Sequence, residues 1–473
     1  MSRRRAHSTL AELPEAFVAR QQAVLGDEAD AFLAALTGPA VRSLRVNEHK
    51  ASLAEVAERL RLTVDPVPWC PTATYLPPDT RLGDTVEHRA ALFYLQEPSC
   101  TAVVEALGIE PHHRVLDIAA APGGKATHAA SRLGPDGLLL VNEVTSARLG
   151  PLLANLDSWG YPNTAITNVA AQRLADALPA TFDRVIVDAP CSGEALFRRQ
   201  PSARAEWSEA QVAGAARRQG KLLHCAARTV APGGLLAYST CTFAFTENEH
   251  QVAAFLDGHR DWELADISAL PGAVVSPVSD ADEERSWPGH ALRFYPHRCQ
   301  CEGQFVAVLR APGQQVPGQQ VPGQRADARQ ARTQRRKAAP PHPAWAEFAR
   351  RTLRNELDQA RVQFTGTTFY LRPTAMELPA DLALRPGLLL GHLAGSTFRP
   401  AHALAMALKP AEVTAYEALG GDELLAFRQG LPVARAGPPG WVLVTVDRWP
   451  VGWARRRDDM LFPRLPGHAR ARG

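Results

Sequence analysis

The sequence has little net charge, few cysteines and no long apolar run, and each shortage excludes a class of protein. No apolar run approaches the roughly 18 residues that a membrane-spanning helix needs, so we expect no membrane partner. The basic start of the chain has no apolar segment behind it, which argues against a secretory signal. The chain has 52 Lys and Arg residues against 49 Asp and Glu, a net charge of +3 that identifies no partner by itself.

Cysteine usage is equally restrictive. Seven cysteines, an odd number without any Cys-x-x-Cys pair, make neither a disulfide framework nor a zinc framework. We therefore expect a reducing, cytoplasmic location and no metal site. No obligate protein partner is evident from the sequence.

The length of 473 residues suggests about three domains, and a hydrophobic fraction of 45% is enough to build several cores. One segment interrupts the globular pattern: residues 311–323 read APGQQVPGQQVPG, which cannot bury apolar surface. The expected organisation is an N-terminal region (1–105), a core (106–310), a flexible linker (311–340) and a C-terminal module (341–473). A run of arginines in the linker is either a solvated tether or an RNA-contacting arm: Arg325, Arg329, Arg332, Arg335 and Arg336, followed by Lys337.

Between residues 114 and 310, short apolar runs alternate with helical patterns that start near Gly124, Ser146, Glu206 and Thr246. This alternation predicts an α/β domain with a mostly parallel, doubly wound sheet, whose ligands bind at the carboxyl ends of the strands. The predicted strands are residues 115–118, 138–142, 165–168, 185–188 and 235–239.

The first predicted strand runs into a turn of small residues, Ala119-Ala120-Ala121-Pro122-Gly123-Gly124-Lys125, at the start of a helix. Such a turn lets the backbone approach a ligand closely. It lacks the Gly-x-Gly-x-x-Gly and Gly-Lys-Ser/Thr patterns, which favours a small nucleoside cofactor over a dinucleotide or a triphosphate. Glu143, at the end of the second strand, is placed to accept hydrogen bonds from ribose hydroxyls, and Arg148 either orients Glu143 or is solvated.

Two cysteines follow neighbouring strands. The fourth strand ends in Asp188-Ala189-Pro190-Cys191-Ser192-Gly193 and the fifth in Ser239-Thr240-Cys241-Thr242. Because the carboxyl ends of adjacent parallel strands meet, we expect Cys191 and Cys241 to line one cleft. Cys100 and Cys225 are interpreted as ordinary buried hydrophobes.

The glycine turn, the Asp188 to Gly193 segment with the following Glu194, and the Ser239 to Thr242 segment resemble, in this order, the signatures of the NOL1/NOP2/Sun family of S-adenosylmethionine-dependent RNA cytosine-5 methyltransferases. The resemblance covers about residues 40–310, and Ser43-Leu44-Arg45-Val46-Asn47 resembles the Arg-x-Asn element that precedes the family's core. The C-terminal module is most similar to that of the bacterial RsmF-like subgroup, which acts on small-subunit ribosomal RNA.

The resemblance implies a Rossmann-like class I methyltransferase core, a smaller N-terminal α+β region and a C-terminal RNA-binding module with a PUA-like end. It implies that Cys241 adds to carbon-6 of cytosine, that Cys191 releases the product and that Asp188 contacts the ring nitrogen and the cofactor. S-adenosyl-L-methionine is the implied cofactor, held by the residues from Ala119 to Lys125 with Glu143, Arg148 and Asp188. We add the hypothesis that a cation such as Lys125 favours deprotonation of Cys241.

Further residues are candidates for holding RNA around an unstacked cytosine. Phe197, Arg198 and Arg199 follow the Cys191 motif, although Phe197 fits packing equally well. In the tail, tryptophans alternate with arginines, which suits stacking plus phosphate contact unless the tryptophans are core. These tail residues are Trp441, Trp449, Trp453, Arg448, Arg455, Arg456 and Arg457.

The expected function is thus methylation of carbon-5 of cytosine in RNA, most specifically in 16S ribosomal RNA within the small ribosomal subunit. Two alternatives stay open: the same reaction on transfer RNA, because the motifs do not encode the substrate, and a non-catalytic RNA-binding assembly factor. The presence of both Cys191 and Cys241 argues against the latter, because a binding protein needs neither thiol.

Overall fold

A computed structural model describes residues 13–279, 285–313, 340–355 and 357–470. The predicted linker lies almost wholly outside these residues, as does its run of arginines. Among the residues described, no helix combines the length and the apolar character that crossing a bilayer requires.

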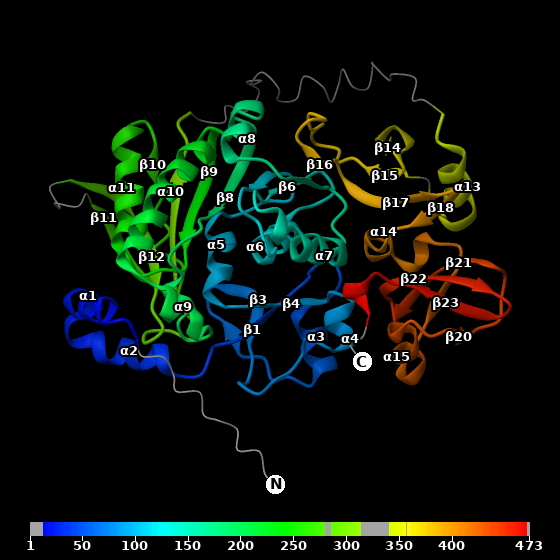
Figure 1. Cartoon of the computed structure of the whole chain (residues 1–473), viewed down its shortest axis with the longest axis horizontal. Helices are drawn as coiled ribbons and strands as arrows, with labels where there is room; N and C mark the ends of the chain where they lie inside the picture. Colours follow the sequence, from blue (N-terminus) through cyan, green and yellow to red (C-terminus); the bar gives the residue numbers. More distant parts are fainter. Residues whose placement is uncertain (1–12, 280–284, 314–339, 356, 471–473) are drawn as a thin grey trace, which may run out of the picture.

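The centre of the fold is a mixed sheet whose five inner strands are parallel (Figure 1). The strand order is β11-β12-β13-β9-β8-β5-β6-β7-β16, and β10 pairs with β13. Each predicted strand is present within a few residues of its expected bounds, so the α/β prediction is confirmed. The strands of this sheet are β5 (Arg114–Asp117), β6 (Leu138–Asn142), β7 (Thr164–Thr167), β8 (Phe182–Asp188), β9 (Val230–Thr240), β10 (Glu263–Leu264), β11 (Val274–Ser279), β12 (Ser286–Phe294), β13 (Gln304–Arg310) and β16 (Ala383–Arg385).

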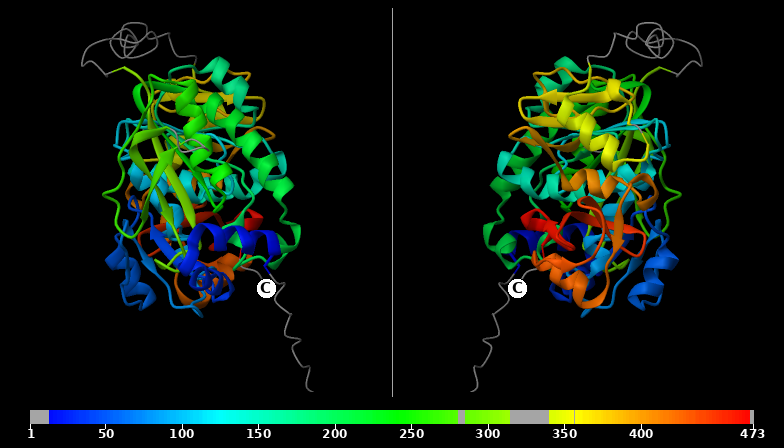
Figure 2. Two further views of the ribbon diagram at one scale, coloured as in Figure 1. Left: turned by 90° about the vertical axis from the view of Figure 1, so that its left-hand side faces the viewer. Right: turned by 90° about the vertical axis from the view of Figure 1, so that its right-hand side faces the viewer.

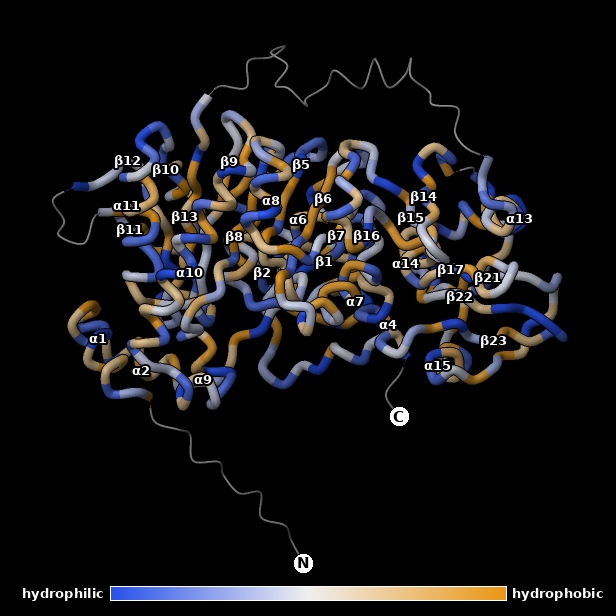
Figure 3. Tube along the Cα trace, turned by 45° about the horizontal axis from the view of Figure 1, so that its top comes forward, coloured by the Kyte–Doolittle hydropathy of each residue, from blue (hydrophilic) through white to orange (hydrophobic). Residues whose placement is uncertain are grey.

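Helices cover both faces of the sheet, because successive side chains of a buried strand point to opposite sides. Leu139 and Val141 of β6 pack into one hydrophobic cluster with α5, α6 and α7, whereas Leu138 and Leu140 pack into a second with α8, α10 and α11. The central residues of the inner strands are accordingly hydrophobic (Figure 3). The core helices are α5 (Ala102–Ala106), α6 (Gly124–Arg132), α7 (Leu149–Trp159), α8 (Ala171–Ala177), α9 (Pro201–Glu206), α10 (Glu209–Ala227) and α11 (Glu249–Gly258).

The N-terminal region is α+β, as predicted. Its four strands form the antiparallel sheet β2-β3-β1-β4, and its first two helices pack beside the carboxyl edge of the core. Its elements are α1 (Glu15–Leu25), α2 (Ala29–Thr37), β1 (Ser43–Val46), α3 (Leu53–Leu60), β2 (Pro66–Val67), β3 (Cys70–Tyr75), α4 (Val86–Arg89) and β4 (Phe93–Gln96).

The C-terminal residues form two further sheets, β14-β15-β17-β18 and β19-β21-β22-β23-β20. Strands β21 and β22 pair in an antiparallel hairpin within the second of these sheets. The elements are α13 (Pro343–Thr352), β14 (Val362–Thr365), β15 (Thr368–Leu371), β17 (Leu388–Ala394), β18 (Thr397–Pro400), α14 (His402–Ala407), β19 (Tyr416–Ala418), α15 (Gly421–Gln429), β20 (Val433–Ala434), β21 (Gly440–Val446), β22 (Trp449–Arg457) and β23 (Met460–Arg464).

The C-terminal residues are less separate from the rest of the chain than the sequence predicted. Strand β16 adds to the edge of the core sheet by pairing with β7, Ala383 opposite Thr167. Leu44 and Phe93 of the N-terminal sheet also share one hydrophobic cluster with Val442 and Leu461. The N-terminal sheet and the last C-terminal sheet therefore pack against each other, blue beside orange and red (Figures 1 and 2).

Candidate active site at the carboxyl edge of the sheet

The carboxyl ends of the inner strands surround a cleft of about 260 Å³. Its lining includes Ala119, Ala121, Lys125, Arg148, Asp188, Cys191 and Cys241, all of them predicted as site residues. Ala120, Pro122, Gly123, Gly124 and Glu143 are not part of the lining. The remaining lining residues are Glu97, Cys100, Ala189, Pro190, Gly193, Ala195, Leu196, Arg199, Glu302, Gly303 and Gln304.

The two predicted thiols meet in this cleft. Asp188 of β8 lies opposite Ser239 of β9 in a parallel register, so the segments after both strands leave the sheet together. The Sγ atoms of Cys191 and Cys241 are 3.3 Å apart. The prediction that these cysteines share one cleft is confirmed.

A buried carboxylate braces the two cysteine segments. Glu247 is fully buried and accepts hydrogen bonds from the backbone N–H of Ser192 (2.9 Å) and from Nε2 of Gln219 (2.8 Å). The hydroxyls of Ser192 and Thr242 are 2.8 Å apart, which joins the residue after Cys191 to the residue after Cys241. Burial raises the pKa of Glu247, although its hydrogen bonds oppose that shift. The sequence did not predict this brace.

Lys125 and Asp188 form an ion pair beside the thiols. Nζ of Lys125 is 2.9 Å from Oδ2 of Asp188, whose Oδ1 accepts a hydrogen bond from Ser239 at 3.0 Å. Burial lowers the pKa of the Lys125 ammonium, but the Asp188 carboxylate together with Cys100 and Cys241 more than offsets burial and holds that pKa above its ordinary value. Lys125 is thus a charged group whose ion-pair partner is Asp188.

The environment of Cys241 disagrees with the hypothesis that Lys125 promotes its deprotonation. The hydrogen bond with Cys191 raises the pKa of the Cys241 thiol, and burial raises it further. Lys125 attracts charge on Cys241 but does not outweigh these causes, so the net shift of the Cys241 pKa is upward.

The turn that begins at Ala119 is held from several sides. Gly123 has φ +112°, a left-handed conformation that favours glycine, and an added Cβ would lie 3.3 Å from Leu152. Arg45, from the Arg-x-Asn element, is fully buried and donates to the carbonyl of Gly124 at 3.1 Å. Arg148 donates to the carbonyl of Ala121 at 2.5 Å. The N-terminal region therefore supports the predicted cofactor turn.

Glu143 and Arg148 act together. Glu143 is 2% exposed, and its Oε1 accepts a hydrogen bond from the backbone of Thr145 at 2.8 Å. Its Oε2 lies 3.2 Å from a guanidinium nitrogen of Arg148 but makes no hydrogen bond within the described residues. Of the two roles considered for Arg148, the structure favours orientation of Glu143.

Asp117 is a buried acid beside the site that the sequence analysis did not single out. It ends β5 next to the turn, is 1% exposed, and neither carboxylate oxygen has a hydrogen-bond partner among the described residues. Burial raises the pKa of Asp117 to about 7, with a further contribution from Asp188. Its position at the carboxyl end of a predicted strand could have identified it as a candidate.

The interpretation of Cys100 as an ordinary buried hydrophobe is wrong. Cys100 lines the cleft, and its thiol donates to Oε1 of Gln304 at 3.4 Å. Burial raises the pKa of this thiol too. Both residues come from outside the parallel strands, Cys100 before β5 and Gln304 at the start of antiparallel β13, so the strand-end rule does not predict them.

Two of the three residues expected to hold RNA near Cys191 are structural instead. Phe197 is fully buried, with its ring centroid 5.0 Å from that of Phe17. Arg198 donates to the carbonyls of Ala35 and Cys301. Only Arg199 is exposed and lines the cleft.

The tryptophans and arginines of the tail divide between the two alternatives, core and exposed surface. Trp453 is fully buried, and Trp449 is 6% exposed with its indole N–H donating to the carbonyl of Lys50 at 2.8 Å. Arg456 is buried against Glu417. These residues are core, whereas Trp441 is partly exposed.

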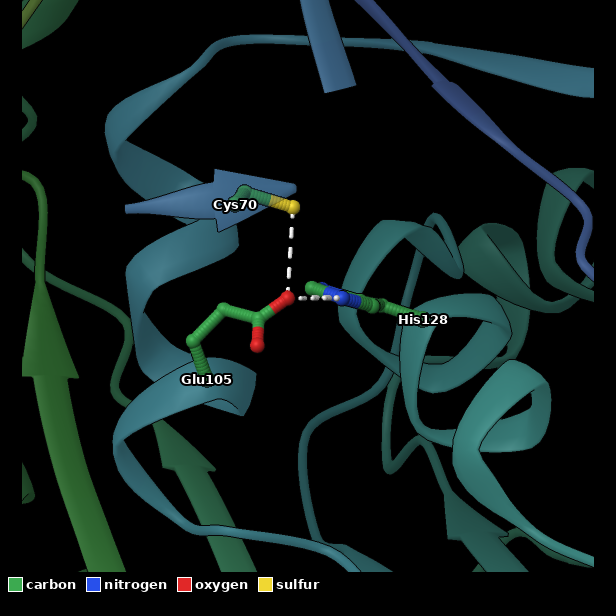
Figure 4. Close-up of side chains that lie close together, drawn as sticks. All are labelled: Cys70, Glu105 and His128. Carbon is green, nitrogen blue, oxygen red and sulfur yellow. Dashed lines mark hydrogen bonds and ion pairs between the residues drawn. The ribbon is translucent and has the colours of Figure 1, made fainter. Parts of the chain in front are cut away.

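A second polar cluster lies away from the cleft. Oε1 of Glu105 accepts hydrogen bonds from the thiol of Cys70 (3.3 Å) and from Nε2 of His128 (3.1 Å), as Figure 4 shows. Such residue types can bind a metal ion. Here Arg132 already pairs with Glu105, and buried Arg45 adds positive charge, which opposes a cation. The cluster ties β3, α5 and α6 together.

Family models match three parts of the chain. Residues 104–310 match "16S rRNA methyltransferase RsmB/F", residues 13–98 match the "N-terminal domain of 16S rRNA methyltransferase RsmF", and residues 347–408 match the "RsmF rRNA methyltransferase first C-terminal domain".

Individual proteins agree with these models. The chain is 38% identical over 311 residues to the ribosomal RNA small subunit methyltransferase F of Salmonella arizonae, and 36% identical over 315 residues to that of Erwinia tasmaniensis. These matches cover 63% and 64% of this chain, and the same shares of the two relatives.

Solved structures share the fold. A methyltransferase homologue from Pyrococcus horikoshii is 27% identical with a TM-score of 0.55, over 63% of this chain and 95% of that one. NSun6 from the same organism superposes with a TM-score of 0.56 at 20% identity, over 64% of this chain and all of that one. Residues 13–98, 104–310 and 347–408 are thus similar to the corresponding parts of 16S rRNA methyltransferases of the RsmB/F type, and the solved structures share the methyltransferase fold.

Proposed function

We propose that this protein uses S-adenosyl-L-methionine to methylate carbon-5 of cytosine in RNA. The observation that carries the proposal is the pair of thiols, Cys191 and Cys241, 3.3 Å apart in a cleft that also contains Asp188. Carbon-5 of cytosine is a poor nucleophile, and adding a thiolate to carbon-6 activates it. A second thiol beside the first fits an enzyme that must also break the resulting bond.

The residues present fit the cofactor. Glu143 keeps one buried carboxylate oxygen without a hydrogen-bond partner, as a ribose hydroxyl requires, and Gly123 keeps the turn open where a Cβ would crowd Leu152. The backbone from Ala119 to Lys125 would hold the rest of the molecule, with Arg148 fixing both Glu143 and the turn. When bound, S-adenosyl-L-methionine supplies an electrophilic methyl group.

Each catalytic side chain has a proposed task. Cys241, once deprotonated, adds to carbon-6 of the cytosine. Asp188, positioned by Lys125 and Ser239, faces the cleft; once it has taken up a proton it would donate that proton in a hydrogen bond to the ring nitrogen, which makes carbon-6 more electrophilic. Cys191 would assist release of the methylated base, in which the proton on carbon-5 leaves, the bond between Cys241 Sγ and carbon-6 breaks, and the electron pair of that bond returns to Cys241. The target cytosine must be unpaired or turned out of its stack to enter.

We further propose small-subunit ribosomal RNA as the substrate and the cytoplasm as the location. The substrate rests on the names of the matching family models and of both relatives. The location rests on seven free cysteines, because an oxidising compartment would favour disulfides.

The test uses 16S ribosomal RNA and small subunits purified from a strain that lacks the gene. The purified protein and S-adenosyl-L-methionine are added, and bisulfite sequencing reports 5-methylcytosine. We expect new methylation with the wild type, none with Cys241→Ala, and a covalent RNA adduct on a denaturing gel with Cys191→Ala. Cys225→Ala, at a half-buried thiol outside the cleft, is the matched control and should retain activity. Cytosines that stay unmodified by the wild type on both substrates would refute the proposal.

A further inference from the structure

A second cavity lies in the C-terminal part of the chain, away from the cleft. Its volume is about 750 Å³. Residues of α13 and β18 form one side, and residues of β19, β21, β22 and β23 form the other, on the right in Figure 1. It shares no lining residue with the catalytic cleft. We call this cavity the arginine groove.

The lining of the arginine groove is strongly positive. Five of its arginines are exposed: Arg351, Arg354, Arg399, Arg455 and Arg464. Glu347 is its only acidic lining residue, and it lies 3.2 Å from Arg351. Across the part of the chain that the structure describes, no carboxylate comes within 4.0 Å of Arg399, Arg455 or Arg464, so their charges are free to bind an anion.

Aromatic surfaces lie among these charges. Tyr416 is 51% exposed and Trp441 is partly exposed, and the guanidinium of Arg455 lies 5.5 Å from the centre of a Trp441 ring. Phosphates bind arginines, and bases stack on aromatic rings with little regard to sequence. An acidic protein segment would use the arginines but would gain little from the rings.

We propose that the arginine groove binds an unpaired segment of the RNA substrate, with phosphates on Arg399, Arg455 and Arg464 and a base on Tyr416. The inference rests on the proposed function for the identity of the polymer. It adds a second contact site that anchors RNA apart from the cytosine being modified.

The test measures binding directly. Fluorescence anisotropy follows a labelled, unstructured RNA of about 12 nucleotides, within the usual site size for such grooves. We expect the double variant Arg399→Glu/Arg455→Glu to bind at least ten times more weakly and to lose roughly 0.7 in the slope of log affinity against log salt for each phosphate contact removed. Reversing Arg217 and Arg260, exposed arginines that line neither cavity, is the charge-matched control and should have a much smaller effect.

Two milder variants guard against misfolding. Arg464→Gln removes one unpaired charge, and Tyr416→Ala removes a stacking surface; we expect roughly five- to a hundredfold weaker binding for the latter. Thermal melting checks that each variant is folded. Wild-type affinity and salt slope in the folded groove variants would overturn the proposal, as would binding of an oligoglutamate peptide in place of the RNA.

The binding assay needs no methyl transfer, so the two proposals can fail separately. A protein that binds RNA through the groove but leaves cytosine unmodified refutes only the proposed function. A protein that methylates RNA while the groove variants bind it like the wild type refutes only the groove.

Discussion

The ammonium of Lys125 lies 2.9 Å from Oδ2 of Asp188, and the two ends of this pair differ in exposure. The side chain of Lys125 is 9% exposed, whereas that of Asp188 is 37% exposed. The lysine is therefore the buried anchor and the carboxylate is the group that the cleft presents. Because Ser239 holds the other oxygen of Asp188, the carboxylate has little freedom to turn away.

This arrangement predicts that Asp188→Asn lowers kcat by roughly 10²- to 10⁴-fold, the usual range for losing a positioned acid or base. The measurement is single-turnover methylation at saturating RNA and cofactor. Asp261→Asn, an exposed carboxylate outside the cleft, is the control. A kcat close to that of the wild type would remove Asp188 from the mechanism.

Measurements of stability can separate the catalytic role of Asp188 from the structural role of its ion pair with Lys125. Asp188→Asn leaves Lys125 buried and unpaired, which should cost about 3–5 kcal/mol of unfolding free energy. The double variant Lys125→Met/Asp188→Asn removes both charges, so we expect it to recover most of that stability but none of the activity. Recovery of activity together with stability would mean that the pair is only structural.

Asp117 predicts a pH dependence of folding. Burial, and then Asp188, raises the pKa of Asp117 from 3.8 to about 7. Between these values the unfolded chain has lost a proton that the folded chain retains, so rising pH destabilises the folded protein by about 1.4 kcal/mol per pH unit. Asp117→Asn has no carboxyl group to titrate and should not lose this stability. Urea titrations should therefore show that the unfolding free energy of the variant minus that of the wild type is larger at pH 8 than at pH 4. An equal difference at both pH values would contradict the raised pKa.

The centre of the site could be predicted from the sequence because buried strands are recognised from short apolar runs, which are local features of the chain. Residues 138–142 were expected as a strand and are β6, because a strand buried on both faces is a continuous apolar run. Neighbouring parallel strands end together, so the strand-end rule also predicted that Cys191 and Cys241 would meet.

The rest of the site depends on packing between distant segments. Cys100 and Gln304 reach the cleft from outside the parallel strands, and Glu247 reaches Ser192 from the segment after β9. Phe197 looks like a stacking residue in sequence and is core only because helix α1 brings Phe17 against it. No local sequence pattern predicts these contacts, because they join segments that are far apart in the chain.

The thiol pair predicts a reactivity that depends on Cys191. Its hydrogen bond is the first cause of the raised pKa of Cys241, so Cys191→Ala should lower that pKa. Alkylation of Cys241 by iodoacetamide at pH 8 should then be faster, by up to about tenfold for each unit of pKa, as mass spectrometry of the labelled peptide can report. Equal rates with and without Cys191 would show that the hydrogen bond does not control the thiol.

Glu143 predicts a loss of cofactor affinity. Hydrogen bonds to a charged group contribute about 1.5–3 kcal/mol, so Glu143→Gln should weaken binding of S-adenosyl-L-methionine by roughly ten- to a hundredfold in isothermal titration calorimetry. Glu263→Gln, at an exposed strand edge, is the control. An unchanged dissociation constant would place the ribose elsewhere.

Trp449 and Trp441 predict opposite results for stability and RNA binding. Trp449 is 6% exposed, donates its indole N–H to Lys50 and packs against the guanidinium of Arg59, so it joins the two terminal regions. Trp449→Ala should lower the unfolding free energy by about 3–5 kcal/mol, the usual cost of emptying a tryptophan site. Trp441 is partly exposed at the arginine groove, so Trp441→Ala should cost less stability and weaken RNA binding more. If Trp449→Ala instead weakened RNA binding without lowering the melting temperature, the assignment of Trp449 to the core would be wrong.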